Sequence, residues 1–319
     1  MKVTNPTGPR TLHPQLCAAL ASLRARRGFN AANYADTKAR MLNSYLSRHG
    51  LKSTVVAVSG GIDSAVVLGL AVRAARIHDS PIQRIVPVLA PVFANSATNQ
   101  DDATARGRAA AASCGLDASV VDLSATHATL KKTVDAAVGI HGEAWASGQL
   151  VAYARTPAFY YVTSLLNQEG LPAVLLGTTN RDEGAYLGYV GKASDGMVDV
   201  QLIADLHKSE VRALGAVLEL PAEVRDAVPA GDMYDGRDDE QVFGAPYDFV
   251  ELYLGWRCLP QNEKYALSVD WTPETIAEFR ELGDHLERLH AYNAHKYLVG
   301  SPAVHLNLLQ SAVPGGWTS

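Results

Sequence analysis

Cysteine is scarce in this sequence. The 319 residues include three, Cys17, Cys114 and Cys258, which lie far apart. An odd number of scattered cysteines argues against a disulfide framework and against a zinc cluster, because both need several cysteines at defined spacings. We therefore expect a reduced protein in the cytoplasm.

Positive charge and long apolar runs are also lacking. Lys and Arg number 28 against 33 Asp and Glu, which gives a formal net charge of −5, whereas a protein that binds nucleic acid presents a basic face. No apolar run reaches the length of a membrane span, and the first residues lack the apolar core of a signal peptide. We expect no nucleic-acid partner and no attachment to a membrane.

Internal repeats, low-complexity tracts and an evident linker are absent from the sequence as well. Residues 1–14 carry three prolines and little apolar pattern, so we predict an irregular N-terminal arm there. We predict that residues 15–319 form a single domain, because the length is sufficient for one large core.

Short β-branched runs alternate with longer helical patterns over most of the chain. This alternation predicts the α/β class: a doubly wound, mostly parallel sheet flanked by helices, with ligands at the carboxyl ends of the strands. Beyond residue 198 the alternation fades, and we predict a C-terminal helical extension with a loop at residues 221–241. The predicted strands are 54–58, 84–89, 119–123 and 173–176, and the predicted helices are 15–26, 34–49, 65–75, 100–114, 126–138, 145–167 with a kink or a start at Pro157, 206–218, 246–255 and 273–289.

A sharp turn at residues 59–64, Ser-Gly-Gly-Ile-Asp-Ser, joins the first predicted strand to its helix. Glycines let the backbone approach an anion, and the unpaired N–H groups of the first helical turn point at it. Ser59 and Ser64 add hydroxyl donors, and Asp63 offers a carboxylate to a cation. The turn has neither the lysine-containing phosphate-loop pattern nor Gly-x-Gly-x-x-Gly. The alternative is an ordinary glycine-rich connection in which Ser64 is an N-cap.

A second polar loop, residues 177–183, follows the strand predicted at 173–176. Its Glu183 and Asp63 both follow strand ends, where two carboxylates can share a Mg²⁺ ion that bridges phosphates. Alternatively, Glu183 only caps the next helix. Lys192 and Lys208 could meet a polyphosphate as point charges, although each, taken alone, also fits a solvated surface residue.

The turn at residues 59–64 resembles the pyrophosphate loop of the ATP pyrophosphatase superfamily, whose members split ATP between its α and β phosphates. Further motifs occur in the order seen in NAD⁺ synthetases, and the resemblance covers roughly residues 34–302. It implies a Rossmann-like fold of the adenine nucleotide alpha hydrolase type. The motifs are residues 177–183, Lys192 with Asp195-Gly196, residues 205–212, residues 228–233, Asp239-Glu240 with Phe243-Gly244 and Tyr247-Asp248, and His295-Lys296.

This resemblance implies ATP-dependent amidation of deamido-NAD to NAD⁺, through an acyl-adenylate, with release of pyrophosphate and AMP. It implies Mg²⁺ as the metal, held by Asp63 and Glu183, and Asp63 and Lys208 as catalytic residues. The ATP-binding residues that it implies are Ser59, Gly60, Gly61, Asp63, Ser64, Thr178 and Lys208. The substrate-binding residues are Arg155, Lys192, Asp199, His295 and Lys296, of which the last two would close over the site.

Free ammonia is the expected nitrogen source, because this chain has no room for the amidohydrolase domain of glutamine-dependent members. A separate glutaminase partner stays possible. The resemblance also implies a homodimer with substrate bound across the interface, and the aromatic run at residues 159–161 fits an interface. Plain core packing explains the same run equally well.

Two positions depart from the family pattern. Tyr153 stands where an arginine is expected, and Ala230 replaces a threonine, which removes a hydroxyl donor that contributes on the order of 1 kcal/mol. These departures leave open an amide ligase that acts on a different carboxylate. A tRNA-modifying enzyme would need a basic surface and sulfur-carrying cysteines, and a non-catalytic module would be expected to lack one of the metal carboxylates.

Overall fold

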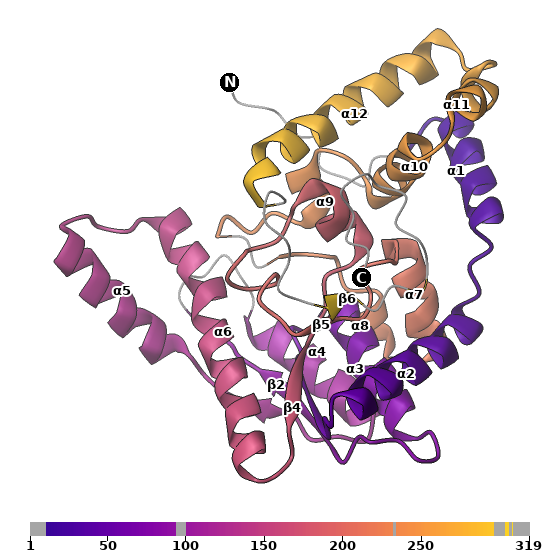
Figure 1. Ribbon diagram of the computed structural model, residues 1–319. Coiled ribbons are helices and arrows are strands. Elements are labelled where there is room, and N and C mark those ends of the chain that lie inside the picture. The colour runs from indigo at the N-terminus through magenta and orange to yellow at the C-terminus, as the bar shows by residue number, and fades with distance from the viewer. Residues whose placement is uncertain (1–10, 94–99, 232–233, 297–303, 306–307, 309–319) are drawn as a thin grey trace.

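A six-stranded parallel sheet forms the centre of the molecule, which is described by a computed structural model for residues 11–93, 100–231, 234–296, 304–305 and 308 (Figure 1). The predicted α/β class with a parallel sheet is confirmed. The strand order is β3-β2-β1-β4-β5-β6. The strands are β1 (Ser53–Ala57), β2 (Arg84–Leu89), β3 (Ser119–Val120), β4 (Ala173–Gly177), β5 (Val200–Gln201) and β6 (Val304–His305).

Helices cover both faces of this sheet. Successive strand residues point to opposite faces, so Val56 packs with α2 (Ala31–Arg48) and α3 (Ile62–Ala75), whereas Val55 packs with the apolar side of α6 (Ala144–Gln168). Both side chains are fully buried. The sheet is therefore doubly wound, as predicted.

The order of the strands reverses between β1 and β4. From β1 the chain proceeds to β2 and β3 on one side, and from β4 it proceeds to β5 on the other. In open parallel sheets the crevice outside such a reversal is where ligands bind. The loops at residues 58–61 and 178–181 leave the sheet at this point.

The α5–α6 hairpin projects from the body of the molecule at the left of Figure 1. It contains α5 (Ser124–Val138) and α6, and α6 runs without interruption through Pro157. Of the kink or helix start predicted at Pro157, the helix start is therefore wrong. In the aromatic run at residues 159–161, Phe159 and Tyr160 pack on the sheet, whereas Tyr161 is 66% exposed.

A second hydrophobic core lies in the C-terminal extension. Apolar residues of α1 (Pro14–Arg27), α10 (Tyr247–Arg257) and α12 (Pro273–Tyr292) meet there with Tyr186 and Leu187. The predicted helical extension is present, and α1 joins it from the other end of the chain. The remaining helices are α4 (Gln100–Ser113), α7 (Lys208–Val217), α8 (Ala222–Arg225), α9 (Asp239–Phe243), α11 (Gln261–Ser268) and the 3-10 helix η2 (Ala294–Lys296).

Several short elements differ from the prediction. The region 221–241, predicted as loop, contains α8 and the start of α9, where Asp238 and Gln241 form a reciprocal capping box. A π-helical turn, η1 (Asp182–Leu187), follows the second polar loop. β5 and β6 were not predicted, because segments of two residues are too short to show a period. α11 was not predicted either, because none of its residues is buried and it therefore has no apolar face to recognise.

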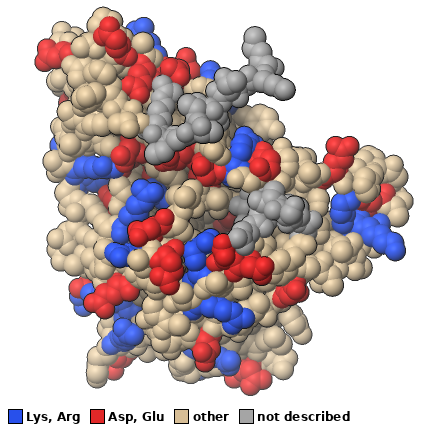
Figure 2. Space-filling view, turned by 180° about the vertical axis from the view of Figure 1, so that it is seen from behind, with Lys and Arg blue, Asp and Glu red and all other residues tan. Residues whose placement is uncertain are grey.

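Residues 1–10, most of the predicted N-terminal arm, lie outside the described part of the chain. The proposed division at residue 14 therefore stays a prediction. Among the described residues, no helix has the length and apolarity needed to cross a membrane. Figure 2 shows acidic and basic side chains interspersed over one face of the molecule.

Candidate active site

The turn between β1 and α3 is held in shape by its own two serines. Ser64 Oγ accepts a hydrogen bond from Ser59 N at 3.1 Å and donates one to the Gly61 carbonyl at 3.0 Å. Ser59 Oγ accepts from Gly61 N at 3.3 Å. Within the described residues no side chain caps the start of α3, so its first N–H groups can serve an anion.

Gly60 allows α4 to lie directly on this turn. Its φ is +85°, and a Cβ atom there would lie 2.2 Å from the Ala103 carbonyl oxygen. Arg106 of α4 donates from Nε to the Gly60 carbonyl at 3.1 Å. Only glycine satisfies both the left-handed backbone and the close approach.

Three predicted residues, Asp63, Glu183 and Lys208, meet beside the turn. Lys208 Nζ lies 2.5 Å from Asp63 Oδ2 and 3.1 Å from Glu183 Oε1. They come from the start of α3, from η1 and from the start of α7. The lysine and both carboxylates are mostly buried, with side-chain exposures of 3%, 17% and 15%.

Asn180 links the two carboxylates. Its Nδ2 donates to Asp63 Oδ1 at 2.9 Å and to Glu183 Oε1 at 2.6 Å, and its Oδ1 accepts from Glu183 N at 3.1 Å. The sequence analysis quoted Asn180 within its motif but gave it no role. The sequence signal that could have indicated this role is its position three residues before Glu183, because an Asn side chain can accept a hydrogen bond from the backbone N–H three residues later.

Tyr247 and Asp239 extend this cluster into the C-terminal extension. Tyr247 OH lies 2.8 Å from Glu183 Oε1 and 2.8 Å from Asp239 Oδ2, and Lys208 Nζ lies 4.9 Å from the centre of the Tyr247 ring. Both residues occur in the family pattern quoted above, again without a role. Here the extension contributes directly to the candidate site.

Burial and charge shift the pKa values of this cluster. Burial raises the pKa of Glu183 to about 8, while the nearby Lys208 charge acts in the opposite direction. Burial also raises the pKa of Asp239. Burial by itself would lower the pKa of Lys208, but the surrounding carboxylates outweigh it and hold the pKa above its ordinary value. Lys208 is therefore charged.

The donor set suits a hard cation. Asp63 and Glu183 offer carboxylate oxygens, and the described residues contain no group of three or more His, Cys, Asp or Glu that could enclose a metal. Mg²⁺ is bound in this way, by one or two carboxylates with the remaining oxygens from water and phosphate. The residues present therefore fit Mg²⁺ better than an ion that needs a protein cage.

A second group of predicted residues lies around the loop before β5. Arg155 of α6 donates to the Ala90 carbonyl at 3.0 Å and lines a small hollow of about 120 Å³ with Asp195. Lys296 donates to the Gly188 carbonyl at 2.7 Å, and burial lowers its pKa, with Lys192 adding to the effect.

The other predicted residues lie at separate points. Thr178 is half-buried just after β4, and His295 is exposed, with Nδ1 3.3 Å from the Tyr292 carbonyl. Asp199 accepts from the Leu175 amide at 2.7 Å. Its carboxylate is therefore bound to the middle of β4, before the strand's carboxyl end.

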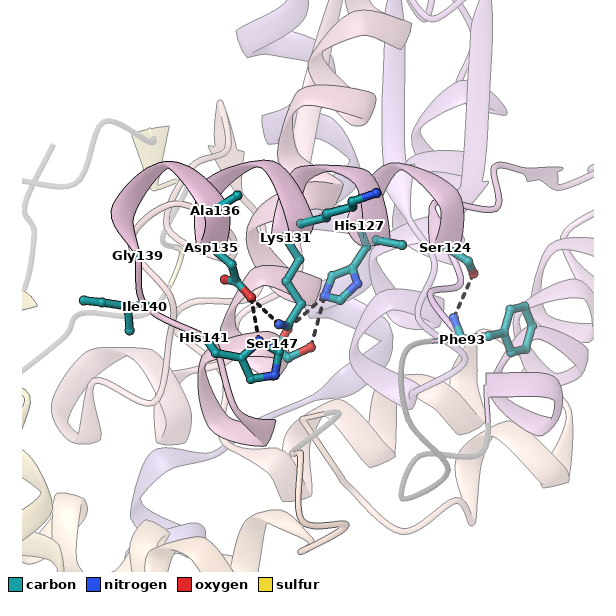
Figure 3. Close-up of a pocket in the computed structure, with 12 residues that line it drawn as sticks. Phe93, Ser124, His127, Lys131, Asp135, Ala136, Gly139, Ile140, His141 and Ser147 are labelled. Carbon is teal, nitrogen blue, oxygen red and sulfur yellow. Dashed lines mark hydrogen bonds and ion pairs between the residues drawn. The ribbon is translucent and has the colours of Figure 1, made fainter.

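A hollow larger than the one beside Arg155 has a different location. It has a volume of about 770 Å³ and lies along α5, where His127, Lys131 and Asp135 point toward the start of α6 (Figure 3). Lys131 Nζ lies 2.5 Å from Asp135 Oδ2. None of the predicted site residues lines this hollow, so its size alone does not identify the site.

Comparisons with known proteins agree on one family. Residues 34–283 match the family model described as NAD synthase. The NH(3)-dependent NAD(+) synthetase of Alkaliphilus metalliredigens is 30% identical over 261 residues, which cover 80% of this chain and 91% of the relative. That of Alkaliphilus oremlandii is 29% identical over 267 residues, with 82% and 92% covered.

Solved structures share the fold. The NAD+ synthetase from Burkholderia pseudomallei aligns with a TM-score of 0.62 and 22% identity, covering 91% of this chain and 99% of that one. The NMN synthetase from Francisella tularensis aligns with a TM-score of 0.64 and 20% identity, covering 85% and 98%.

Proposed function

Since the chain belongs to the NAD synthase family, we propose that it is a ligase that converts deamido-NAD to NAD⁺ with ATP and ammonia. A carboxylate oxygen of the substrate attacks the α-phosphorus of ATP, and pyrophosphate leaves. Ammonia then attacks the carboxyl carbon of the acyl-adenylate, and AMP leaves. The observation that carries the proposal is the meeting of Asp63, Glu183 and Lys208 beside the glycine turn.

The glycine turn is the proposed pyrophosphate site. The backbone of Gly60 and Gly61 lets phosphates approach, and Ser59 offers its hydroxyl. Ser64 keeps the turn in shape through its own hydroxyl, and Thr178 lies at the end of the neighbouring strand β4. Negative charge accumulates on pyrophosphate as it departs, so donors fixed in advance lower the barrier. The uncapped first turn of α3 meets this need.

Lys208 acts as a fixed positive charge for the same leaving group. Its ammonium is already held by Asp63 and Glu183, so little conformational entropy is lost when it engages a phosphate oxygen. A charge-assisted hydrogen bond of this kind contributes about 1.5–3 kcal/mol. Asp63 and Lys208 are therefore the residues proposed to be catalytic.

Asp63 and Glu183 are the residues that would hold Mg²⁺, with Asn180 bound to both carboxylates. The ion would supply positive charge to the phosphate oxygens. The chain's own contribution is to fix the two carboxylates, through Asn180 and, for Glu183, through Tyr247 OH.

The proposed substrate contacts are Arg155, Lys192, Asp199, His295 and Lys296. Arg155 and Asp195 share the small hollow beside α6, and Lys192 lies close enough to Lys296 to affect its pKa. Deamido-NAD carries a pyrophosphate and a carboxylate, so a group of basic side chains at this edge suits it.

The proposed assembly is a cytoplasmic homodimer that uses free ammonia, with a separate glutaminase as a possible partner. The hairpin of α5 and α6 exposes apolar side chains, among them Trp145 at 58% and Tyr161 at 66%. Aromatic residues are enriched at interfaces. This exposure supports the hairpin as the contact between two copies.

An amide ligase that acts on a different carboxylate is the second candidate. It is favoured by Tyr153, which stands on α6 where an arginine is expected, is 41% exposed and lies with its OH 3.4 Å from Gln149 Oε1. A phenol does not replace the fixed charge of a guanidinium.

One experiment separates the two candidates. Purified protein is mixed with Mg·ATP, ammonium and deamido-NAD, and products are identified by mass spectrometry. Parallel mixtures contain glutamine instead of ammonium, or deamido-NMN as a second carboxylate. NAD⁺ with equimolar AMP from ammonium supports the proposal. If the folded protein binds ATP but makes no NAD⁺, and instead makes a product from the second carboxylate, the second candidate function replaces the first.

A further inference from the structure

Three consecutive residues at the start of η1 hold the segment that leads into α7. The Arg181 amide donates to the Leu206 carbonyl at 2.8 Å. Asp182 Oδ1 lies 2.6 Å from His207 Nδ1, and Asp182 Oδ2 accepts from the Lys208 amide at 2.7 Å. Glu183 contacts the ammonium of the same lysine. Adjacent carboxylates therefore hold the two ends of Lys208.

Asp182 is fully buried, with 0% exposure, and His207 is 3% exposed. A buried carboxylate must have its oxygens paired, because an unpaired buried charge is costly. Both Asp182 oxygens are paired with groups at the first turn of α7, where the helix dipole favours negative charge. His207 N in turn donates to Glu210 Oε2 at 2.9 Å. The start of α7 is thus held by Asp182 of η1 and by a contact within its own first turn.

We propose that Asp182 is a positioning residue for Lys208. By fixing the Lys208 amide and the His207 ring, it sets where the lysine side chain begins, so that the ammonium reaches Asp63 and Glu183. This inference rests on the proposed role of Lys208 at the phosphates of ATP. It gives a function to Asp182, which had none in the sequence motifs or in the proposed role of Lys208.

A double-mutant cycle tests the proposal, with Mg²⁺ and the non-cleavable α,β-methylene-ATP as the probe. Affinity is measured by calorimetry for the wild type, Asp182→Ala, Lys208→Met and the double variant. We expect each single variant to bind the probe about tenfold or more weakly, the loss expected for one charge-assisted hydrogen bond. We expect the double variant to bind no more weakly than Lys208→Met, because residues that act through one another are not additive.

Three outcomes overturn the proposal: wild-type affinity in Asp182→Ala, wild-type affinity in Lys208→Met, or a full further loss when Asp182→Ala is added to Lys208→Met. If Asp182→Ala does not fold, Asp182→Asn takes its place in the cycle. Its amide oxygen still accepts a hydrogen bond from the Lys208 amide, so we expect the affinity for the probe to fall by only about threefold. We expect no further loss of affinity when Asp182→Asn is combined with Lys208→Met.

Glu287→Gln is the matched control, which tests whether a general loss of stability is enough to weaken binding of the probe. The Glu287 carboxylate accepts from Tyr186 OH near the end of η1 at 2.7 Å and from Tyr253 OH of α10 at 2.5 Å. We expect this variant to lose stability but to keep wild-type affinity for the probe. The probe needs no carboxylate substrate, so failure to make NAD⁺ would refute the proposed function while the cycle still decides the role of Asp182.

Discussion

Asp63 faces the turn, α7 and η1 at once, and it is more important for the proposed chemistry than for the core. Its side chain is partly exposed, and Lys208 retains Glu183 when Asp63 is removed. We expect Asp63→Ala to lower NAD⁺ formation by about a thousandfold or more, because it removes a carboxylate that would hold Mg²⁺ and that positions the Lys208 ammonium, and these positive charges stabilise the departing pyrophosphate. We expect the variant to fold with a lower melting temperature, because buried Lys208 keeps one of its two carboxylate partners.

The control for this variant is Asp79→Asn, at a carboxylate that is 85% exposed and pairs with His78. Asparagine is used because Asp79 has a positive φ of 64°, which asparagine tolerates better than alanine. Product formation by mass spectrometry and a thermal melt are recorded for both. Near-wild-type turnover by a folded Asp63→Ala protein would contradict the proposed mechanism.

Tyr247 OH is the donor placed between two buried carboxylates, at 2.8 Å from each. Tyr247→Phe leaves Glu183 and Asp239 without this hydroxyl. We expect the free energy of unfolding to fall by about 1–3 kcal/mol, the cost of unpaired buried polar groups. Urea denaturation measures it, with Tyr265→Phe as the control because Tyr265 is 67% exposed. Equal midpoints for the two variants would refute the bridging role.

Some residues of the site can be predicted from the sequence, and others are recognised only from their contacts in the folded chain. Asp63, Glu183 and Lys208 belong to motifs with a recognisable order, and the structure brings them together. The contacts of Asn180 with Asp63 and of Tyr247 with Glu183 span 117 and 64 residues. Such contacts have no local pattern, so only the folded chain reveals them.

At the scale of elements, the contact between α4 and the glycine turn has no room for one added carbon atom at Gly60. Gly60→Ala would place a methyl group 2.2 Å from the Ala103 carbonyl. We expect it to displace the turn or α4, to lower affinity for α,β-methylene-ATP by about tenfold or more, and to cost about 1–3 kcal/mol of stability.

Gly50→Ala is the control for backbone strain. Gly50 also has positive φ, +65°, but nothing lies within 4 Å of a Cβ atom there. We expect Gly50→Ala to lose some stability and to retain affinity for the ATP analogue. If the two variants lose affinity equally, the close approach of α4 is not the cause.

Length explains most of the elements that the sequence missed, with β3 as an exception, because it was predicted at residues 119–123 and has only two residues in the structure. β1 and β2 are five and six residues long and were predicted within one residue at each end. β5 and β6 have two residues each, and their pairing depends on tertiary contacts. The same reason applies to α8 and α9, which have four and five residues.

At the scale of the whole molecule, the proposed dimer makes a prediction about Tyr161. Tyr161→Lys places a charge on the exposed face of α6, where an apolar contact between copies would be disrupted. We expect sedimentation to show a shift from dimer to monomer, and activity to fall with it. Tyr265→Lys is the control, because Tyr265 is exposed to nearly the same extent, 67% against 66%, but lies on α11. A dimer that persists in Tyr161→Lys would exclude this face.

The sheet also has consequences for how the chain folds. β6 pairs with β5 across about a hundred residues, Val200 with Val304, and the Leu308 amide donates to Asp205 at 2.7 Å, three residues before Lys208. Closing so long a loop is entropically costly, and parallel pairing at large sequence separation is slow. The central strands can therefore assemble early, while the edge beside Lys208 closes late. Until then β5 presents open backbone groups to other chains, so aggregation during refolding should begin at this edge.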